Sequence, residues 1–141
     1  MFFFTGISRY ASEIAKKKIE NFPKKNKQLT TMYQMVEEAI NILNSPNTLI
    51  EKFGQLLNES WMLKRELCDG ISTSYIDEIY DVAQSAGAIG GKILGAGGGG
   101  FMLLFAKPEH QSEIKKRLND LLYVPFDFEH SGSQIILNQQ S

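Results

Sequence analysis

The sequence predicts an α+β domain in which helices pack on one face of a small antiparallel sheet. Apolar residues recur at helical spacing from Ser8 to Ala86, and the period then changes to a continuous apolar run, "FMLLFA", directly after Gly100. The chain has 141 residues, which suffices for one domain with its own core. Helices followed by strands are typical of the α+β class.

The first segments are a strand, "MFFFTG", and a helix from Ser8 to Phe22 that Pro23 stops. A polar linker, "PKKNKQ", leads to a second helix that ends at "NSPN". The inward residues expected of the first helix are Ala11, Ile14, Ala15, Ile19 and Phe22; those of the second are Leu29, Met32, Val36, Ala39, Ile40 and Leu43.

Two further helices precede the glycine-rich region. Thr48 is expected to cap a third helix, in which Gly54 marks close packing. A fourth helix runs from Ser74 to Ala86, with Gly87 as its stop. The inward stripes are Leu49, Phe53, Leu56, Leu57, Ser60 and Leu67 in the third helix, and Ile76, Ile79, Tyr80 and Ala83 in the fourth.

The C-terminal part contains the predicted sheet. "FMLLFA" is expected as a buried, central strand, and Pro108 suits the first turn of a fifth helix with Ile114, Leu118, Leu121 and Leu122 inward. "VPFDFE" and "QIIL", joined by "HSGS", predict a β-hairpin.

Composition excludes several classes of protein. The formal net charge of −1 gives no electrostatic reason to expect nucleic acid or an anionic membrane as partner. No apolar run approaches the roughly 20 residues that span a bilayer. The single cysteine, Cys68, excludes an internal disulfide and fits a reducing, cytoplasmic location. His110 and His130 lack metal-ligand spacing, and no metal site or catalytic acid or base is expected.

The stretch "GGKILGAGGGGFMLLFA" carries the strongest functional signal. Clustered glycines allow backbone N–H groups to approach an anion closely and permit positive φ angles. Gly95, Gly97 and Gly100 match G-x-G-x-x-G, but that fingerprint needs a strand before it and a helix after it, whereas the expected order here is helix, loop, strand. A ligand-free connection between helix and strand explains one or two glycines better than five.

This stretch resembles the third motif of the GHMP kinases. "FFTGISRYASEI", "IEKFGQLLNESWMLKREL", "IDEIYDVAQSAGAIGGKILGAGGGGF" and "VPFDFEHSGSQII" are similar to the C-terminal part of D-glycero-D-manno-heptose 7-phosphate kinases or of the related fucose branch. The resemblance covers about residues 2–137. It implies the C-terminal, ferredoxin-like domain of this family over residues 1–141, with residues 1–6 as the end of an N-terminal lobe.

The implied function is ATP-dependent phosphorylation of the anomeric hydroxyl of a heptose 7-phosphate. The family's Pro-x-x-x-Gly-Leu-Gly-Ser-Ser loop, magnesium ligand and activating acid belong to the N-terminal lobe, and none occurs in this chain. The missing lobe and the sugar phosphate are therefore the expected partners. ATP and magnesium are expected in the full-length enzyme but not tightly on this chain alone.

The resemblance also implies site residues. The loop Gly95, Ala96, Gly97, Gly98, Gly99 and Gly100 is expected to close the active site and donate backbone hydrogen bonds. Possible substrate or interlobe contacts are Thr5, Gly6, Arg9, Trp61, Lys64, Arg65 and Lys92.

Ordinary structural roles remain open beside these. Lys64 and Arg65 either neutralise a phosphate or form a solvated helix face, and Trp61 fits the core better than a sugar platform. Arg9 pairs with phosphate or with Glu13, and Lys92 contacts an anion or covers a helix end. Two functions compete with the kinase lobe: a non-catalytic binding or regulatory module of the same fold, and a complete single-domain enzyme, which the missing acid/base pair argues against.

Overall fold

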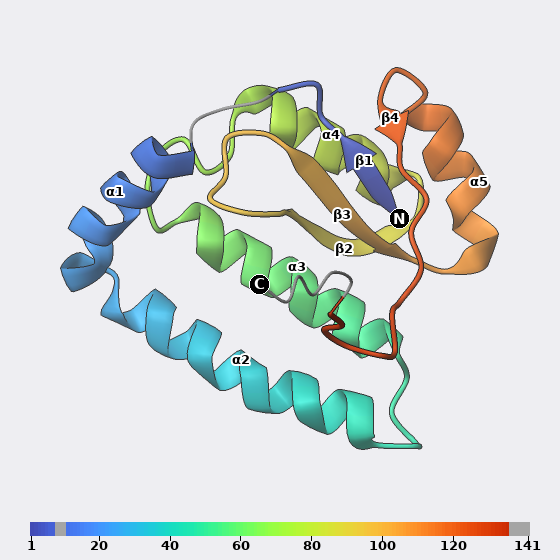
Figure 1. The fold of residues 1–141 in the computed structure, drawn as a ribbon, viewed down its shortest axis with the longest axis horizontal. Helices are drawn as coiled ribbons and strands as arrows, with labels where there is room; N and C mark the ends of the chain where they lie inside the picture. The colour runs from blue at the N-terminus through green and yellow to red at the C-terminus, as the bar shows by residue number, and fades with distance from the viewer. Residues whose placement is uncertain (8–10, 136–141) are drawn as a thin grey trace, which may run out of the picture.

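The structure is a computed structural model that describes residues 1–7 and 11–135 (Figure 1). Its elements, in chain order, are β1 (Phe2–Phe4), α1 (Ala11–Asn21), a 3-10 turn (Phe22–Lys24), α2 (Asn26–Asn44), α3 (Glu51–Arg65), α4 (Ser74–Ser85), β2 (Ala88–Ile93), β3 (Phe101–Ala106), α5 (Pro108–Arg117) and β4 (Leu122–Tyr123).

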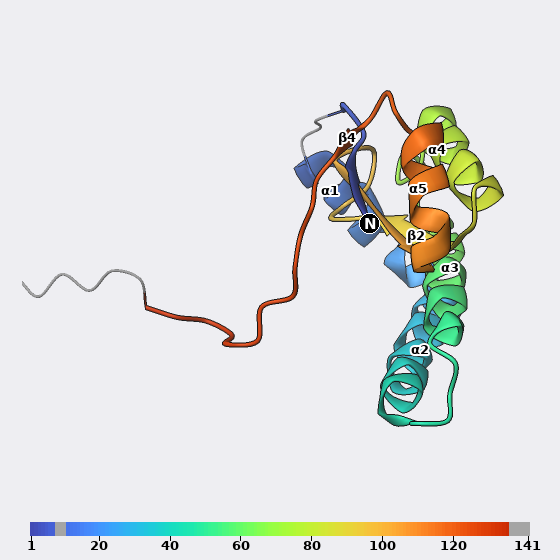
Figure 2. The same ribbon diagram turned by 90° about the vertical axis from the view of Figure 1, so that its right-hand side faces the viewer.

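The four strands form one antiparallel sheet in the order β2-β3-β1-β4. In the register of β1 and β3, Phe3 lies opposite Met102, and "FMLLFA" is an internal strand as predicted. Figure 2 shows α3, α4 and α5 on one side of this sheet, while the segment after β4 runs away from the helices. The predicted α+β class, with helices on a small antiparallel sheet, is confirmed.

The core lies between the sheet and these helices. Alternation along the strands directs Phe3, Met102 and Leu104 into it, and each is at most 2% exposed. Trp61 of α3 and Tyr80 of α4 meet there with ring centroids 6.5 Å apart. The Tyr80 hydroxyl donates to Asn58 Oδ1 at 2.7 Å, and burial raises its pKa to about 12.

One strand was missed by the sequence prediction. β2 occupies Ala88–Ile93, so the glycine loop joins two strands of a hairpin and not a helix to a strand. Glycine is uncommon in strands, so the glycines of β2 looked like part of the glycine-rich loop in the sequence. Gly90 is nevertheless required in β2, because a Cβ there would collide with the backbone carbonyl oxygen of Gly54 in α3. Gly54 itself lies against Phe105 and Ile89, which confirms its predicted close packing.

The helices agree with the sequence to different degrees. α4 buries the four residues predicted for it, and the Thr73 hydroxyl caps its first turn by accepting from the Ile76 N–H at 3.3 Å. The predicted cap of α3 is wrong, since Ile50 occupies that position without a side-chain hydrogen bond.

The face predicted for α2 is also wrong in part. Val36, Ile40 and Leu43 are more than half exposed, and Met35 and Ile42 are buried instead. α2 packs mainly on α3 at the periphery of the domain, so it buries only a narrow stripe.

The predicted C-terminal hairpin does not form in the described residues. Val124 N donates to Phe2 O at 2.8 Å beside β4, but residues 124–135 contain no strand. The end of "QIIL", at residues 136 and 137, lies outside the described part of the chain. Leu122, predicted to face inward from α5, belongs to β4 and is 64% exposed.

Candidate functional site

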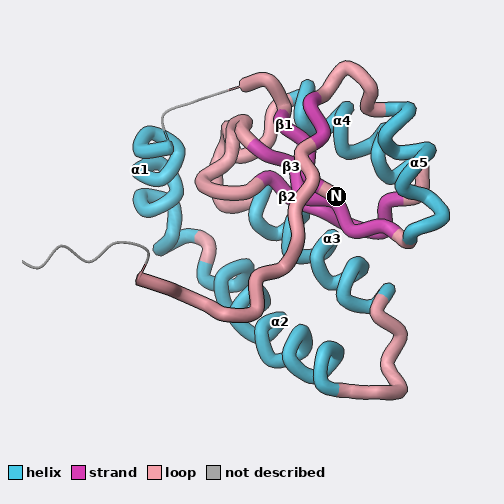
Figure 3. The backbone as a smooth tube through the Cα atoms, turned by 45° about the vertical axis from the view of Figure 1, so that its right-hand side comes forward, coloured by secondary structure: helices cyan, strands magenta, loops and turns pink. Residues whose placement is uncertain are grey.

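The glycine loop, residues 94–100, connects β2 to β3 and projects toward α1 (Figure 3). Leu94 N donates to Phe101 O at 2.9 Å, which closes the hairpin at the base of the loop. The five loop glycines all have positive φ angles: Gly95 (84°), Gly97 (119°), Gly98 (77°), Gly99 (151°) and Gly100 (95°). Residues with a side chain strongly resist such backbone angles, so the backbone conformation is by itself sufficient to require glycine at these five positions.

The distal half of the loop is attached to two other segments. Gly98 N donates to Ile71 O at 2.9 Å, and Gly100 N donates to Ile7 O at 2.8 Å. A Cβ on Gly97 would lie 2.7 Å from Ile71 Cα, and one on Gly99 would lie 2.8 Å from Ile7 O. Packing as well as backbone angle therefore excludes side chains at these two positions.

The predicted residue Thr5 supports the end of the loop. It is 1% exposed, and both its backbone N–H and its hydroxyl donate to Gly100 O, at 2.8 and 2.9 Å. Gly6 follows with a φ of 75° in open space, where it turns the chain out of β1. Arg9 lies outside the described residues.

The N–H groups of the loop fall into two sets. Those of Gly98 and Gly100 are engaged within the chain. Within residues 1–7 and 11–135, no hydrogen-bond acceptor is found for the N–H groups of Gly95, Ala96, Gly97 and Gly99. The backbone donors expected of this loop are thus reduced to those four.

Lys64 does not lie on the solvated helix face that was one of the roles considered for it. Its side chain lies beneath the loop and is only 8% exposed. Nζ donates to Gly95 O at 2.7 Å and to Ile93 O at 3.2 Å. Burial, followed by the positive charges of Lys92 and Lys18, lowers the pKa of Lys64 to about 8. It is therefore not part of a solvated helix face, and its ammonium bonds to carbonyls at the base of the loop.

Trp61 lies in the core, as favoured from the sequence, and is fully buried. Lys64 Nζ lies 5.9 Å from the centroid of its ring. Lys92, in β2 opposite Leu103, is partly exposed beside the start of the loop.

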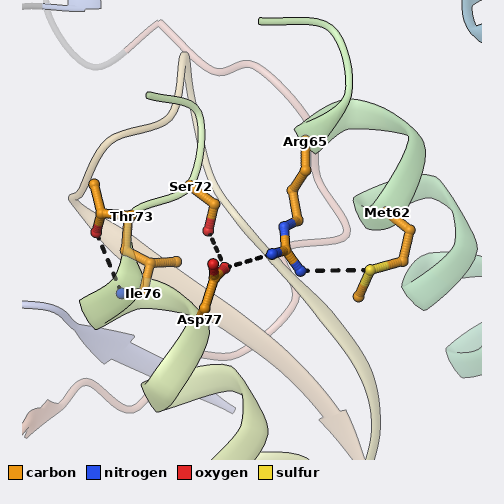
Figure 4. A network of polar contacts seen from close by, with 6 residues as sticks. All are labelled: Met62, Arg65, Ser72, Thr73, Ile76 and Asp77. Atoms are coloured by element: carbon orange, nitrogen blue, oxygen red, sulfur yellow. Dashed lines mark hydrogen bonds and ion pairs between the residues drawn. The ribbon is translucent and has the colours of Figure 1, made fainter. Parts of the chain in front are cut away.

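Arg65 belongs to a polar network at the C-terminal end of α3 (Figure 4). Its Nη2 lies 2.8 Å from Asp77 Oδ1, and Ser72 Oγ donates to the same oxygen at 2.6 Å. Both charged side chains are about one third exposed. Arg65 thus connects α3 to the first turn of α4, and this ion pair gives Arg65 a structural role.

An open cavity of about 610 Å³ lies beside this network. It is lined by Met62, Arg65, Glu66, Cys68, Asp69, Gly70, Ser72 and Asp77. The lining includes Gly70 and Ser72, the two chain neighbours of Ile71, whose carbonyl accepts from Gly98, but it includes no residue of the loop. Its three carboxylates and one guanidinium make it a better environment for hydroxyl groups than for a phosphate.

Other chemistry is sparse in the described residues. Across residues 1–7 and 11–135 no group of three or more His, Cys, Asp and Glu side chains is arranged to hold a metal ion. None of the helices in this part of the chain is both long and apolar enough to cross a membrane. What the site offers is a glycine loop with four amides for which the described residues supply no acceptor, a buried cation beneath it and a polar cavity lined by the neighbours of Ile71.

The family model for the C-terminal domain of GHMP kinases matches residues 45–124, more than half of the chain. The chain belongs to the GHMP kinase family. The matched residues include α3, α4 and the whole hairpin with its glycine loop.

Several kinases of this family are similar to the chain. The bifunctional fucokinase/GDP-fucose pyrophosphorylase of Arabidopsis thaliana is 30% identical over 125 residues, which are 83% of this chain and 11% of that protein. The D-glycero-alpha-D-manno-heptose 7-phosphate kinase of Campylobacter jejuni is 32% identical over 119 residues, 82% and 34% of the two chains. The mevalonate kinase of Thermococcus gammatolerans is 43% identical over 89 residues, 61% and 26%.

The fold agrees with a solved relative. The crystal structure of Methanococcus jannaschii mevalonate kinase superposes with a TM-score of 0.69 at 26% identity, over 86% of this chain and 36% of that one. The chain therefore spans about a third or less of the length of these relatives. The heptose 7-phosphate kinase is one of several similar kinases, so the comparisons establish the family and not the substrate.

Two features of the site escaped the sequence interpretation. Ile7 and Ile71 hold the loop through backbone carbonyls, and no side-chain signal marks such contacts. The position of Lys64 had a possible signal, because a lysine three residues after an inward-facing tryptophan lies on the same face of the helix.

Proposed function

We propose that this chain is the C-terminal lobe of an ATP-dependent sugar kinase that phosphorylates the anomeric hydroxyl of a heptose 7-phosphate. The observation that carries the proposal is the glycine hairpin loop in a member of the GHMP kinase family, held on three sides and with four amides that find no acceptor among the described residues. Phosphoryl transfer depends mainly on positioning and on neutralising charge, and a rigid loop of this kind supplies the former.

Two sugar kinases are among the similar proteins, which is compatible with a sugar as acceptor. The heptose 7-phosphate kinase and the fucokinase match over 119 and 125 residues, whereas the mevalonate kinases match over 89 to 118. The cavity beside Arg65 also has the polar lining that a polyhydroxylated molecule requires. A fucokinase-like enzyme is the alternative within the sugar kinases.

In this proposal the two lobes divide the work. An N-terminal lobe binds ATP with magnesium and activates the hydroxyl, while this chain closes the site with its loop. In the proposed complex the Ala96 and Gly97 N–H groups donate to phosphoryl oxygens and stabilise their negative charge. The kinase acts in the cytoplasm, where ATP is present and Cys68 remains a free thiol.

The test uses the full-length protein with ATP, magnesium and one acceptor at a time: heptose 7-phosphate, fucose or mevalonate. We expect the highest kcat/KM for heptose 7-phosphate, with transfer to the anomeric oxygen followed by phosphorus NMR. Preference for mevalonate would contradict the sugar assignment. Binding of a sugar phosphate without transfer to any acceptor would support the non-catalytic module instead.

The isolated chain provides a second test. It contains no residue in a catalytic role, so we expect no useful transfer from ATP in a coupled assay. Turnover of about 1–100 per second, the usual range for kinases, would show that one lobe suffices.

A further inference from the structure

Lys64 and Thr5 are the polar or charged side chains buried among the described residues, and Lys64 is the one that carries charge. Its Nζ bonds to Ile93 O and Gly95 O, the two carbonyls on either side of Leu94. β2 ends at Ile93, so these carbonyls stand where the hairpin opens into the loop. The ammonium thus replaces a neighbouring strand as the hydrogen-bond partner at this point.

Placing a charge here is unfavourable in itself. In the described part of the chain Lys64 forms no ion pair, and the charged groups that act on it, Lys92 from β2 and Lys18 from α1, are both cations. Burial of an unpaired charge costs free energy, and an apolar side chain would fill the same space without that cost. The compensating gain is a pair of charge-assisted hydrogen bonds to the loop.

The hydrogen bond from Lys64 to the Gly95 carbonyl also fixes what the loop presents on the side facing away from Lys64. In a planar trans peptide the carbonyl and the following N–H point in opposite directions. Lys64 draws the Gly95 carbonyl toward itself, so the Ala96 N–H points away from Lys64. That N–H is one of the four for which the described residues provide no acceptor. Gly95 has a φ of 84°, and a Cβ added to it would meet no atom within 4 Å, so no side-chain packing at Gly95 helps to hold this peptide in place.

We propose that Lys64 is a positioning residue that fixes the Gly95–Ala96 peptide so that the Ala96 N–H is presented to a phosphate oxygen of the bound substrate. The role rests on the kinase function proposed above, but the orientation of the peptide can be tested without it. Lys64 touches no substrate and acts entirely through the loop. A protonated lysine holds the carbonyl more strongly than a neutral one, because charge-assisted bonds are about twice as strong.

The pH dependence distinguishes the positioning of the loop by Lys64 from the contribution of Lys64 to stability, because the two change in opposite directions with pH. Because the pKa of Lys64 is about 8 in the folded protein, lower than its usual 10.5, the unfolded state binds more protons between these values. The contribution of Lys64 to stability therefore rises as pH increases from about 8 to 10.5. The order of the loop falls over the start of the same interval, so the two properties move in opposite directions.

The first experiment follows the amide resonances of Gly95 and Ala96 in the full-length protein by NMR from pH 6.5 to 9.5. We expect both to titrate with a midpoint near 8 in the unaltered protein, and to lose that transition in Lys64→Met. Lys52→Met is the matched control, an exposed lysine on the same helix, and should keep it. No transition near pH 8, or the same transition in Lys64→Met, would overturn the proposal whether or not the protein is a kinase.

The second experiment measures kcat and KM over the same range of pH. We expect Lys64→Met to reduce kcat at least tenfold at pH 7 with less than a threefold change in the KM for ATP. Lys64→Arg keeps its charge at all these pH values, so it should restore part of the kcat and remove the alkaline decline. An unchanged kcat in folded Lys64→Met, shown by its circular dichroism, would refute the positioning role while leaving the kinase function intact. Absence of activity in the unaltered protein would refute the kinase function instead.

Discussion

Replacing Gly95 and Gly97 separately by alanine distinguishes backbone strain from steric exclusion in the loop. Both residues have positive φ, but only Gly97 faces backbone atoms, with Ile71 Cα 2.7 Å and Ile71 O 2.8 Å from the position of a Cβ. At Gly95 that position is open. The strain alone costs about 1–2 kcal/mol for a left-handed residue. The contact with an immobile backbone adds about 1–3 kcal/mol at Gly97.

We therefore expect Gly97→Ala to lose about 2 kcal/mol more than Gly95→Ala, the middle of the range for that contact. For a domain of this size that difference lowers Tm by a further 4–8 °C or so, at about 2–4 °C per kcal/mol. The assay is thermal and urea unfolding of the two variants under identical conditions. Gly70→Ala is the matched control for strain, because Gly70 has a φ of 86° and open space around it.

Activity should show the opposite order. Gly95→Ala changes the peptide that carries the Ala96 N–H, so kcat/KM of the folded full-length protein should fall more than tenfold while Tm falls less than in Gly97→Ala. Gly97→Ala should mainly reduce the amount of folded protein, before any change in the kcat/KM of the molecules that remain folded. Equal Tm values for the two variants would refute the steric argument, and unchanged kcat/KM in Gly95→Ala would show that this part of the loop serves the fold alone.

Two further substitutions and one chemical modification test other parts of the structure. Thr5→Val removes the hydroxyl that donates to Gly100 O and should cost about 1 kcal/mol in urea unfolding; a neutral result would mean that the Thr5 N–H alone holds the loop. Gly90→Ala places a Cβ against the Gly54 carbonyl, so we expect loss of cooperative unfolding by circular dichroism, and a native-like transition would contradict the crossing of α3 on β2. Cys68 is buried and its pKa is raised by desolvation, so a thiol reagent at pH 8 should react at least tenfold faster in denaturant than with the native protein.

The parts of the fold that the sequence predicts well are those governed by a strong local pattern. α4 has a four-residue apolar stripe and a terminal glycine, and both act as expected. "FMLLFA" is apolar throughout because it is an internal strand with helices over one face.

The failures arise where tertiary contacts override local preference. Gly90 looks like loop in the sequence, but it is needed where two backbones approach, and only the crossing of α3 reveals this. Val36 and Ile40 have ideal helical spacing, yet α2 has little to pack against other than α3. Lys64 is equally compatible with a surface position until the hairpin places two carbonyls beside it.

The crossing of α3 over β2 at Gly54 and Gly90 determines how the loop can move. Packed elements usually slide past one another by small shear motions, which the layer of side chains between them absorbs. At this crossing that layer is absent, so the helix is locked to the strand. Lys64 lies ten residues farther along α3, about 15 Å from Gly54 along the axis, and therefore keeps a fixed distance from Ile93. Any opening of the site has to arise as a hinge within residues 94–100, with Lys64 as its stationary anchor.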